Sequence, residues 1–307
     1  MLAMGAACWF TDAARRIRHI LEMIRFSHTL FALPFALLSA AMAWRANLRE
    51  DPPVLLSWRE FLGILICMVC ARSAAMAFNR LVDRELDAAN PRTAGRHLPR
   101  GILSVKTVAW FTVVTSAGFI AGTLLFLPRN PWPLMGALPV LGFLFAYSYT
   151  KRFTLLSHFW LGSALMLAPV AAWIALRPEF DWAPVLLGTA VLFWVAGFDI
   201  IYACQDVEFD RRMRLRSIPA RLGVPTALRV AAACHAMMFL ALLLLPQLYS
   251  EFGLIYYGGI AAIGLLLVIE HRLVEPGDLS RVNQAFFHAN AIVSVTLFAV
   301  GSLDLVM

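Results

Sequence analysis

The chain alternates between long apolar segments and short polar ones from about residue 26 onward. Each apolar segment contains roughly twenty residues, the length that an α-helix needs to cross the hydrocarbon core of a bilayer. We therefore expect an all-α, polytopic membrane protein. The pattern predicts nine transmembrane helices, at residues 26–44, 58–82, 102–127, 133–150, 154–176, 182–203, 226–249, 253–270 and 284–303.

The residues before the first predicted span follow a different pattern. Residues 9–24 are amphipathic and carry several arginines, which is typical of a helix that lies in the membrane interface. We divide the chain into an interfacial N-terminal segment, residues 1–25, and one nine-helix membrane domain, residues 26–307.

Composition and charge agree with a protein that is embedded in a lipid bilayer. Hydrophobic residues make up 61% of the 307 residues and charged residues only 15%. The net charge of +7 is compatible with nucleic-acid binding. In so apolar a chain, cationic loops on the cytoplasmic side explain it better. We expect no nucleic-acid partner.

Basic residues alternate between the predicted loops, which sets an orientation. They gather at the N-terminus and in the loops after the second, fourth, sixth and eighth spans. By the positive-inside rule these segments face the cytoplasm, as in a multi-pass protein of the inner (cytoplasmic) membrane. The loop residues concerned are Arg84, Arg92, Arg96, Arg100, Lys151, Arg152, Arg211, Arg212, Arg214, Arg216, Arg221, Arg272 and Arg281.

Two stripes of acidic residues lie at the cytoplasmic ends of predicted spans. Asn79, Asp83 and Asp87 are spaced i, i+4, i+8, so on a helix they share one face. Asp199, Tyr202, Gln205, Asp206 and Asp210 form a second such set at the end of another span. Carboxylate and amide oxygens are ligands that Mg²⁺ prefers. One stripe alone could be a solvated helix end, but two equivalent stripes beside arginines favour a site for a metal-bound diphosphate.

Ionisable residues at membrane depth are costly, so each is a functional candidate. Arg72 lies in the middle of its predicted span, on the face of Asn79. It binds an anionic ligand or forms a structural ion pair, for example with Asp199, and both can apply at different steps. Lys151 and Arg152 are further candidates for anion binding. The rings of Tyr202 and Tyr147 could stabilise a carbocation.

Two other functions are compatible with intramembrane acids. A cation-coupled transporter would carry them near the bilayer midplane, on helices broken by Gly or Pro. Here they lie at helix ends beside arginines, which favours phosphate chemistry. A membrane prenyl diphosphatase would in addition require a positioned water, and no residue indicates one.

The chain resembles the UbiA superfamily of intramembrane prenyltransferases over nearly its whole length, from RFSHTLFALPFALLSA at Arg25 to the last span. The most specific segments are RSAAMAFNRLVDRELDAANPRTAGRHLPRG, YSYTKRFT and GFDIIYACQDVEFDRR. The family pattern N-x-x-x-D-x-x-x-D matches Asn79, Asp83 and Asp87, and its second D-x-x-x-D matches Asp206 and Asp210. Within the superfamily, the segments NPRTAGRHLPRG and SYTKRFT most resemble the 4-hydroxybenzoate polyprenyltransferases and their relatives in the futalosine route to menaquinone.

This resemblance implies helices around a central cavity, a Mg²⁺ requirement, and an enzyme that transfers a polyprenyl chain from polyprenyl diphosphate to an aromatic acid acceptor in ubiquinone or menaquinone biosynthesis. It implies 4-hydroxybenzoate or a dihydroxynaphthoate as acceptor. In this interpretation the metal ligands are Asn79, Asp83, Asp87, Asp206 and Asp210. Asp199 supports them or acts as a base on the acceptor side. The substrates contact Asn79, Arg72, Lys151, Arg152, Tyr202, Tyr147 and Arg25.

Overall fold

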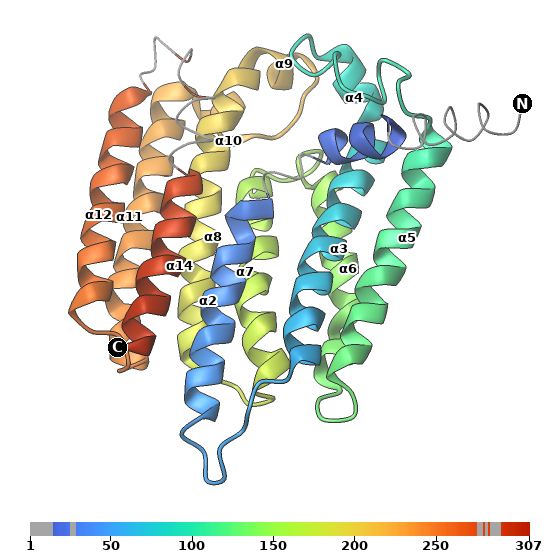
Figure 1. Ribbon diagram of the computed structural model, residues 1–307. Helices are drawn as coiled ribbons and strands as arrows, with labels where there is room; N and C mark the ends of the chain where they lie inside the picture. Colours follow the sequence, from blue (N-terminus) through green and yellow to red (C-terminus); the bar gives the residue numbers. More distant parts are fainter. Residues whose placement is uncertain (1–14, 25–28, 275–278, 280–281, 283–289) are drawn as a thin grey trace, which may run out of the picture.

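The computed structural model describes residues 15–24, 29–274, 279, 282 and 290–307, and the regular structure within them is entirely helical (Figure 1). Arg25, one of the predicted substrate contacts, lies outside the described residues. The long helices are α2 (Thr29–Asn47), α3 (Trp58–Val82), α5 (Val105–Thr123), α6 (Trp132–Thr150), α7 (Ser157–Leu176), α8 (Trp182–Ala203), α11 (Val224–Leu248), α12 (Leu254–Leu273) and α14 (Asn290–Val306).

The predicted spans can be compared with these helices one by one. Each predicted range overlaps one of the long helices, and the ends differ by a few residues. Among the described residues, 7 helices are long and apolar enough to cross a membrane. α14, with only 17 described residues, and α2 are not among these 7. The all-α membrane architecture is thus confirmed, whereas the count of nine spans stays a prediction.

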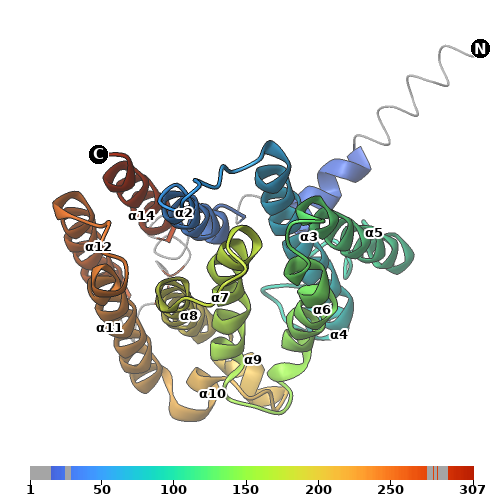
Figure 2. The ribbon, with the colours of Figure 1, turned by 90° about the horizontal axis from the view of Figure 1, so that it is seen from below.

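The long helices run up and down, and their connections lie at the two ends of the bundle (Figure 1). Seen along the helices, α3, α5 and α6 form one group and α11, α12 and α14 another, with α2, α7 and α8 between them (Figure 2). α8 is buried along most of its length, between α7 and α11. It therefore forms the centre of the apolar core, where Trp194 is fully buried.

Glycines allow α8 to approach its neighbours closely. A Cβ atom on Gly162 of α7 would lie 2.3 Å from the carbonyl oxygen of Leu192 in α8. A Cβ atom on Gly197 of α8 would lie 2.3 Å from the ring of His235 in α11. Small residues at such positions are a common means of helix packing in membranes, where the hydrophobic effect does not drive helices together.

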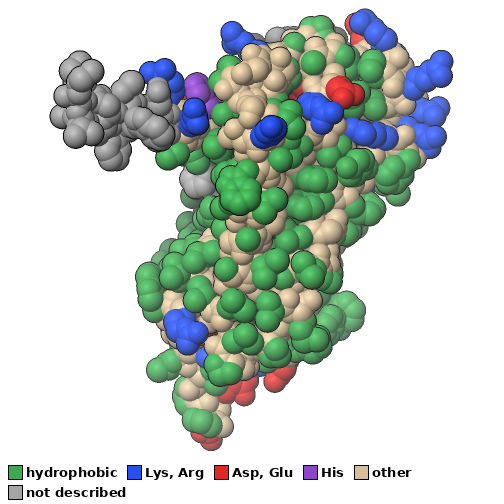
Figure 3. Space-filling view, turned by 90° about the vertical axis from the view of Figure 1, so that its right-hand side faces the viewer, with side chains coloured by type: hydrophobic (Ala, Val, Ile, Leu, Met, Phe, Trp, Pro, Cys, Tyr) green, Lys and Arg blue, Asp and Glu red, His purple; other side chains and the backbone are tan. Residues whose placement is uncertain are grey.

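The surface has the apolar belt of a membrane protein. Figure 3 shows hydrophobic side chains over the middle of one face, and Lys and Arg gathered at the end where α3 finishes and α5 begins. The short helices α4 (Arg84–Ala89), α9 (Val207–Arg212) and α10 (Ile218–Leu222) lie at this same end. We refer to it as the polar end of the bundle.

Residues 15–23 form a helix at the polar end, beside α3 and α5 (Figure 1). Met23 and Ile24 are buried against Ala77, Leu103 and Val108. The arginines of this helix are exposed. This arrangement fits an interfacial helix, although the division of the chain at residue 25 stays a prediction.

The close approach of α7 and α8 predicts a stability effect. Gly162→Ala should lower the free energy of unfolding by about 1–3 kcal/mol, because the new methyl group meets backbone that cannot move aside. Gly136→Ala in α6 is the control, since a Cβ atom there meets nothing within 4 Å. Equilibrium unfolding in mixed micelles measures both. Equal stability of the two variants would contradict this packing.

Candidate active site

Both acidic stripes lie at the polar end, where a long helix breaks and a short one follows. α3 ends at Val82, and Asp83 is both the C-cap of α3 and the N-cap of α4. α8 ends at Ala203, a 3₁₀ turn (Cys204–Asp206) follows, and α9 begins at Val207. The sequence pattern predicts each stripe on a continuous helix, and the structure differs in both cases. Asp83, Asp87, Asp206 and Asp210 lie at or beyond the breaks, whereas Asp199 lies within α8.

Asn79, Asp83 and Asp87 of the first stripe remain in contact across the break. The backbone N–H of Asp83 donates to the Asn79 carbonyl at 2.9 Å, and that of Asp87 donates to the Asp83 carbonyl at 2.7 Å. The Asn79 amide also donates to the Asp83 carboxylate at 3.1 Å. The i, i+4 contacts therefore persist across the turn.

Asp83 is almost fully buried and has cationic partners from another helix end. Lys151 Nζ donates to its carboxylate at 2.9 Å, and Arg152 Nη2 lies 3.4 Å from it. Both cations follow α6, 68 and 69 residues along the chain. Removal of either partner would leave a buried charge less compensated, which is costly.

Asp87 is the second buried carboxylate of the first stripe. Arg96 Nη1 donates to its Oδ1 at 2.6 Å, and Arg80 lies 3.8 Å from its Oδ2. Within the described part of the chain, Asp87 Oδ2 is buried and accepts no hydrogen bond. This oxygen therefore has capacity for a further ligand.

Asp206 of the second stripe is bound by the segment that follows α4. The Asn90 amide donates to its Oδ1 at 2.9 Å, and Arg92 Nε donates to the same oxygen at 2.8 Å. Arg92 Nη2 contacts the other carboxylate oxygen, so the pair is bidentate. Burial of Arg92 favours its neutral form, but the hydrogen bonds and charges of Asp206 and Tyr202 together outweigh burial and raise the pKa of the guanidinium.

Tyr202 belongs to the same cluster. Its hydroxyl accepts a hydrogen bond from Arg92 Nη1 at 2.7 Å, and the Arg92 guanidinium lies 4.8 Å from the ring centroid. One ring face is therefore already in contact with a cation. A cation over the face of the Tyr202 ring is the type of contact that we expect for a carbocation.

Asp210 accepts a hydrogen bond from the Ser217 hydroxyl at 2.6 Å. Lys151, which binds Asp83, also lies within electrostatic reach of Asp210. Lys151 thus connects the two stripes from one side. Residues 90–96 connect them from the other, since Arg96 binds Asp87 while Asn90 and Arg92 bind Asp206.

Asp199 lies one helical turn before Tyr202 and pairs with His158 of α7. The distance between His158 Nδ1 and Asp199 Oδ2 is 2.7 Å. Tyr147 lies within electrostatic reach of both Asp199 and Asp83. Arg72 makes no hydrogen bond or ion pair with any described residue, and its Nε is buried. The structural ion pair between Arg72 and Asp199 is therefore not formed here.

The structure adds four residues to the predicted set: Asn90, Arg92, Arg96 and His158. From the sequence, Arg92 and Arg96 could either contact a ligand or only set the membrane orientation. In the structure both arginines pair with carboxylates. Asn90 gives no signal in the sequence. His158 lies in a segment, residues 151–165, whose polar residues are unusual at the start of a membrane helix. That signal could have found it.

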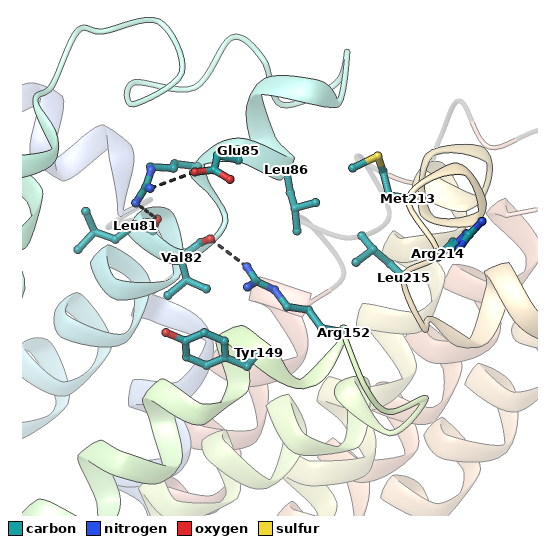
Figure 4. Close-up of a pocket in the computed structure, with 10 residues that line it drawn as sticks. Leu81, Val82, Glu85, Leu86, Tyr149, Arg152, Met213, Arg214 and Leu215 are labelled. Carbon is teal, nitrogen blue, oxygen red and sulfur yellow. Dashed lines mark hydrogen bonds and ion pairs between the residues drawn. The ribbon is translucent and has the colours of Figure 1, made fainter.

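A cavity of about 700 Å³ lies beside the acidic residues at the polar end. Figure 4 shows Arg152 reaching into it from below, with Leu81, Val82 and Leu86 on one side and Met213 and Leu215 on the other. Arg152 also lies 3.4 Å from Asp83, so the cavity wall and the first stripe share this residue. Arg152 therefore connects the cavity with the first stripe.

The donor set fits a hard divalent cation. Asp83, Asp87, Asp206 and Asp210 supply carboxylate oxygens, and Asn79 supplies an amide oxygen. Asp87 Oδ2 is buried without a hydrogen-bond donor among the described residues. The lysine and arginine partners can move to an anionic ligand when the carboxylates bind metal. The arrangement suits a metal-bound diphosphate.

Comparison with known proteins agrees with this chemistry. Residues 32–291 match the model of the UbiA prenyltransferase family. The chain is 30% identical over 258 residues to the 4-hydroxybenzoate octaprenyltransferase of Nitrosomonas europaea, covering 83% of each chain. It is 32% identical over 238 residues to the protein of that name from Nitrosospira multiformis, covering 77% of this chain and 79% of the other.

Solved structures agree as well. A UbiA homologue from Aeropyrum pernix superposes with a TM-score of 0.77 at 29% identity, covering 89% of this chain and 96% of the other. A UbiA homologue from Archaeoglobus fulgidus with GPP and Mg²⁺ bound superposes with a TM-score of 0.69 at 18% identity, covering 94% of this chain and 100% of the other. The second likeness concerns the fold alone.

Proposed function

The chain belongs to the UbiA prenyltransferase family, and we propose that it transfers a polyprenyl chain from polyprenyl diphosphate to an aromatic hydroxy acid of quinone biosynthesis. The observation that supports the proposal is that carboxylates of both acidic stripes lie at the polar end and are paired there with lysine or arginine. The carboxylates suit Mg²⁺ and the cations suit phosphate oxygens. Relatives that are 30% and 32% identical to this chain carry the name 4-hydroxybenzoate octaprenyltransferase.

We assign the metal ligands to Asp83, Asp87, Asp206 and Asp210, with Asn79 as a ligand or as the group that orients Asp83. When bound, Mg²⁺ neutralises part of the diphosphate charge and so makes it a better leaving group. In the structure these carboxylates are neutralised by Lys151, Arg152, Arg92 and Arg96 instead.

The cations change partner in this mechanism. Their side chains leave the carboxylates and bind the diphosphate oxygens, where negative charge develops as the allylic C–O bond breaks. Arginine does so with two parallel hydrogen bonds and lysine as a point charge. The electron pair of the broken bond leaves with the diphosphate, and the prenyl group becomes an allylic cation. Apolar residues around it exclude water.

The acceptor side of the site involves Asp199, His158 and Arg72. An electron-rich ring carbon of the acceptor attacks the allylic cation, and the new C–C bond is followed by loss of the proton on that carbon. His158, whose Nδ1 lies 2.7 Å from Asp199 Oδ2, accepts this proton. Arg72, which has no partner among the described residues, binds the acceptor carboxylate.

The decisive experiment supplies one prenyl diphosphate with 4-hydroxybenzoate or with 1,4-dihydroxy-6-naphthoate and compares kcat/KM by mass spectrometry of the products. We expect prenylated aromatic acid and a preference for one acceptor. The amino-acid sequence of residues 90–101 favours the naphthoate. Prenyl alcohol as the sole product would instead identify a diphosphatase. No turnover of the diphosphate with either acid would refute the proposal.

The metal assignment has its own test. Asp83→Asn and Asp206→Asn should each lower kcat/KM by at least about 100-fold, because loss of a group that only orients a metal ligand already costs about 10–100-fold. Glu208→Gln is the matched control, because Glu208 is exposed on α9 between Asp206 and Asp210. Activity should disappear with a chelator and return with Mg²⁺. Wild-type rates in either aspartate variant would refute the two-stripe site.

We further propose that the polar end faces the cytoplasm of the inner membrane, in accord with its excess of Lys and Arg. Single-cysteine probes in residues 45–57 and 177–182 should then react with an impermeant reagent added to intact cells. Probes in residues 90–100 and 211–221 should react only after the membrane is opened. Labelling of residues 90–100 in intact cells would invert this orientation.

A further inference from the structure

A second cluster of metal-ligating side chains lies at the polar end, apart from the acidic stripes. His19 and Glu22 come from the helix over residues 15–23, and His97 comes from the segment between α4 and α5. One ligand atom from each lies within 4.8 Å of the other two. Among the described residues this is the one group of three His, Cys, Asp or Glu side chains with such spacing.

The distances match those around a tetrahedral ion. His19 Nδ1 lies 3.5 Å from Glu22 Oε2, and His97 Nε2 lies 3.4 Å from the same oxygen. Zinc–nitrogen and zinc–oxygen bonds of about 2.0–2.1 Å at tetrahedral angles place neighbouring ligand atoms about 3.4 Å apart. Glu22 Oε2 thus already has this spacing from both nitrogens, and side-chain rotations that bring the two nitrogens, now within 4.8 Å of each other, to the same spacing would place all three atoms around one ion.

The two oxygens of Glu22 have different surroundings. Oε1 accepts a hydrogen bond from Arg18 Nε at 2.8 Å, whereas Oε2 faces the two histidines. A ligating carboxylate is usually fixed by such an outer hydrogen bond. Arg18 can therefore keep its contact while Oε2 binds an ion. His19 Nδ1 is buried and makes no hydrogen bond within the described part of the chain.

We propose that His19, Glu22 and His97 bind a divalent transition-metal ion of the zinc type, with water as a fourth ligand. Two imidazoles and one carboxylate suit Zn²⁺, whereas the all-oxygen set of the acidic stripes suits Mg²⁺. The ion would join the interfacial helix to the segment whose Arg92 and Arg96 bind Asp206 and Asp87. This site is independent of the proposed prenyl transfer.

Zinc binding to the full chain, purified in detergent without a polyhistidine tag, tests the proposal. Titration with Zn²⁺ against a chromophoric chelator, in an excess of Mg²⁺, should show one equivalent bound. His19→Ala, Glu22→Gln and His97→Ala should each weaken its affinity by at least about 10-fold. Glu208→Gln and the double variant Asp83→Asn/Asp206→Asn should bind Zn²⁺ as the wild type does.

Hydrogen exchange supplies a second measurement that does not depend on the chelator. Zn²⁺ should slow amide exchange in residues 15–24 and 92–103 of the wild type, and should have no such effect in His97→Ala. Unchanged zinc affinity in His97→Ala would overturn the proposal. Loss of zinc in the Asp83→Asn/Asp206→Asn variant would also overturn it, because the ion would then belong to the acidic stripes.

Discussion

The compensation of buried carboxylates at the ends of membrane helices is the constraint on which the polar end of this protein depends. Asp83 and Asp87 are nearly inaccessible to solvent, where an ionised carboxylate is costly unless it is paired. Their partners come from residues 96, 151 and 152. The same pairs fix the relative positions of α3, α6 and the segment after α4. Charge neutralisation therefore serves both the fold and the site.

Such a network is suited to exchange of partners. In the proposed mechanism, each carboxylate binds a metal ion when its cation transfers to another anion, and the diphosphate supplies that anion. Substrate and metal are thereby coupled, because either one alone leaves charges unbalanced. This coupling gives a physical reason for two acidic groups and several cations at one place. The helix breaks at Asp83 and at residues 204–206 contribute to this arrangement, because they lie at the end of the bundle where the acidic side chains gather.

The segment between α4 and α5 contacts three parts of the polar end. Its Arg92 and Asn90 bind the second stripe, its Arg96 binds the first, and its His97 lies against Glu22 of the interfacial helix. The interfacial helix is thus connected to the carboxylates through only a few residues.

The sequence by itself determined the membrane class, the places of the long helices, and the positions of the acidic residues. These features depend on local hydrophobic length and helical spacing, which neighbouring residues specify. Tertiary structure decided the partners: Arg92 lies 114 residues from Asp206, and His158 lies 41 from Asp199. Many cations in the loops could neutralise a given carboxylate, and only the packing of α3, α6, α7 and α8 selects among them. The helix break at Asp83 likewise lies among residues without Gly or Pro, and Lys151 and Arg152, which follow α6, contact its carboxylate.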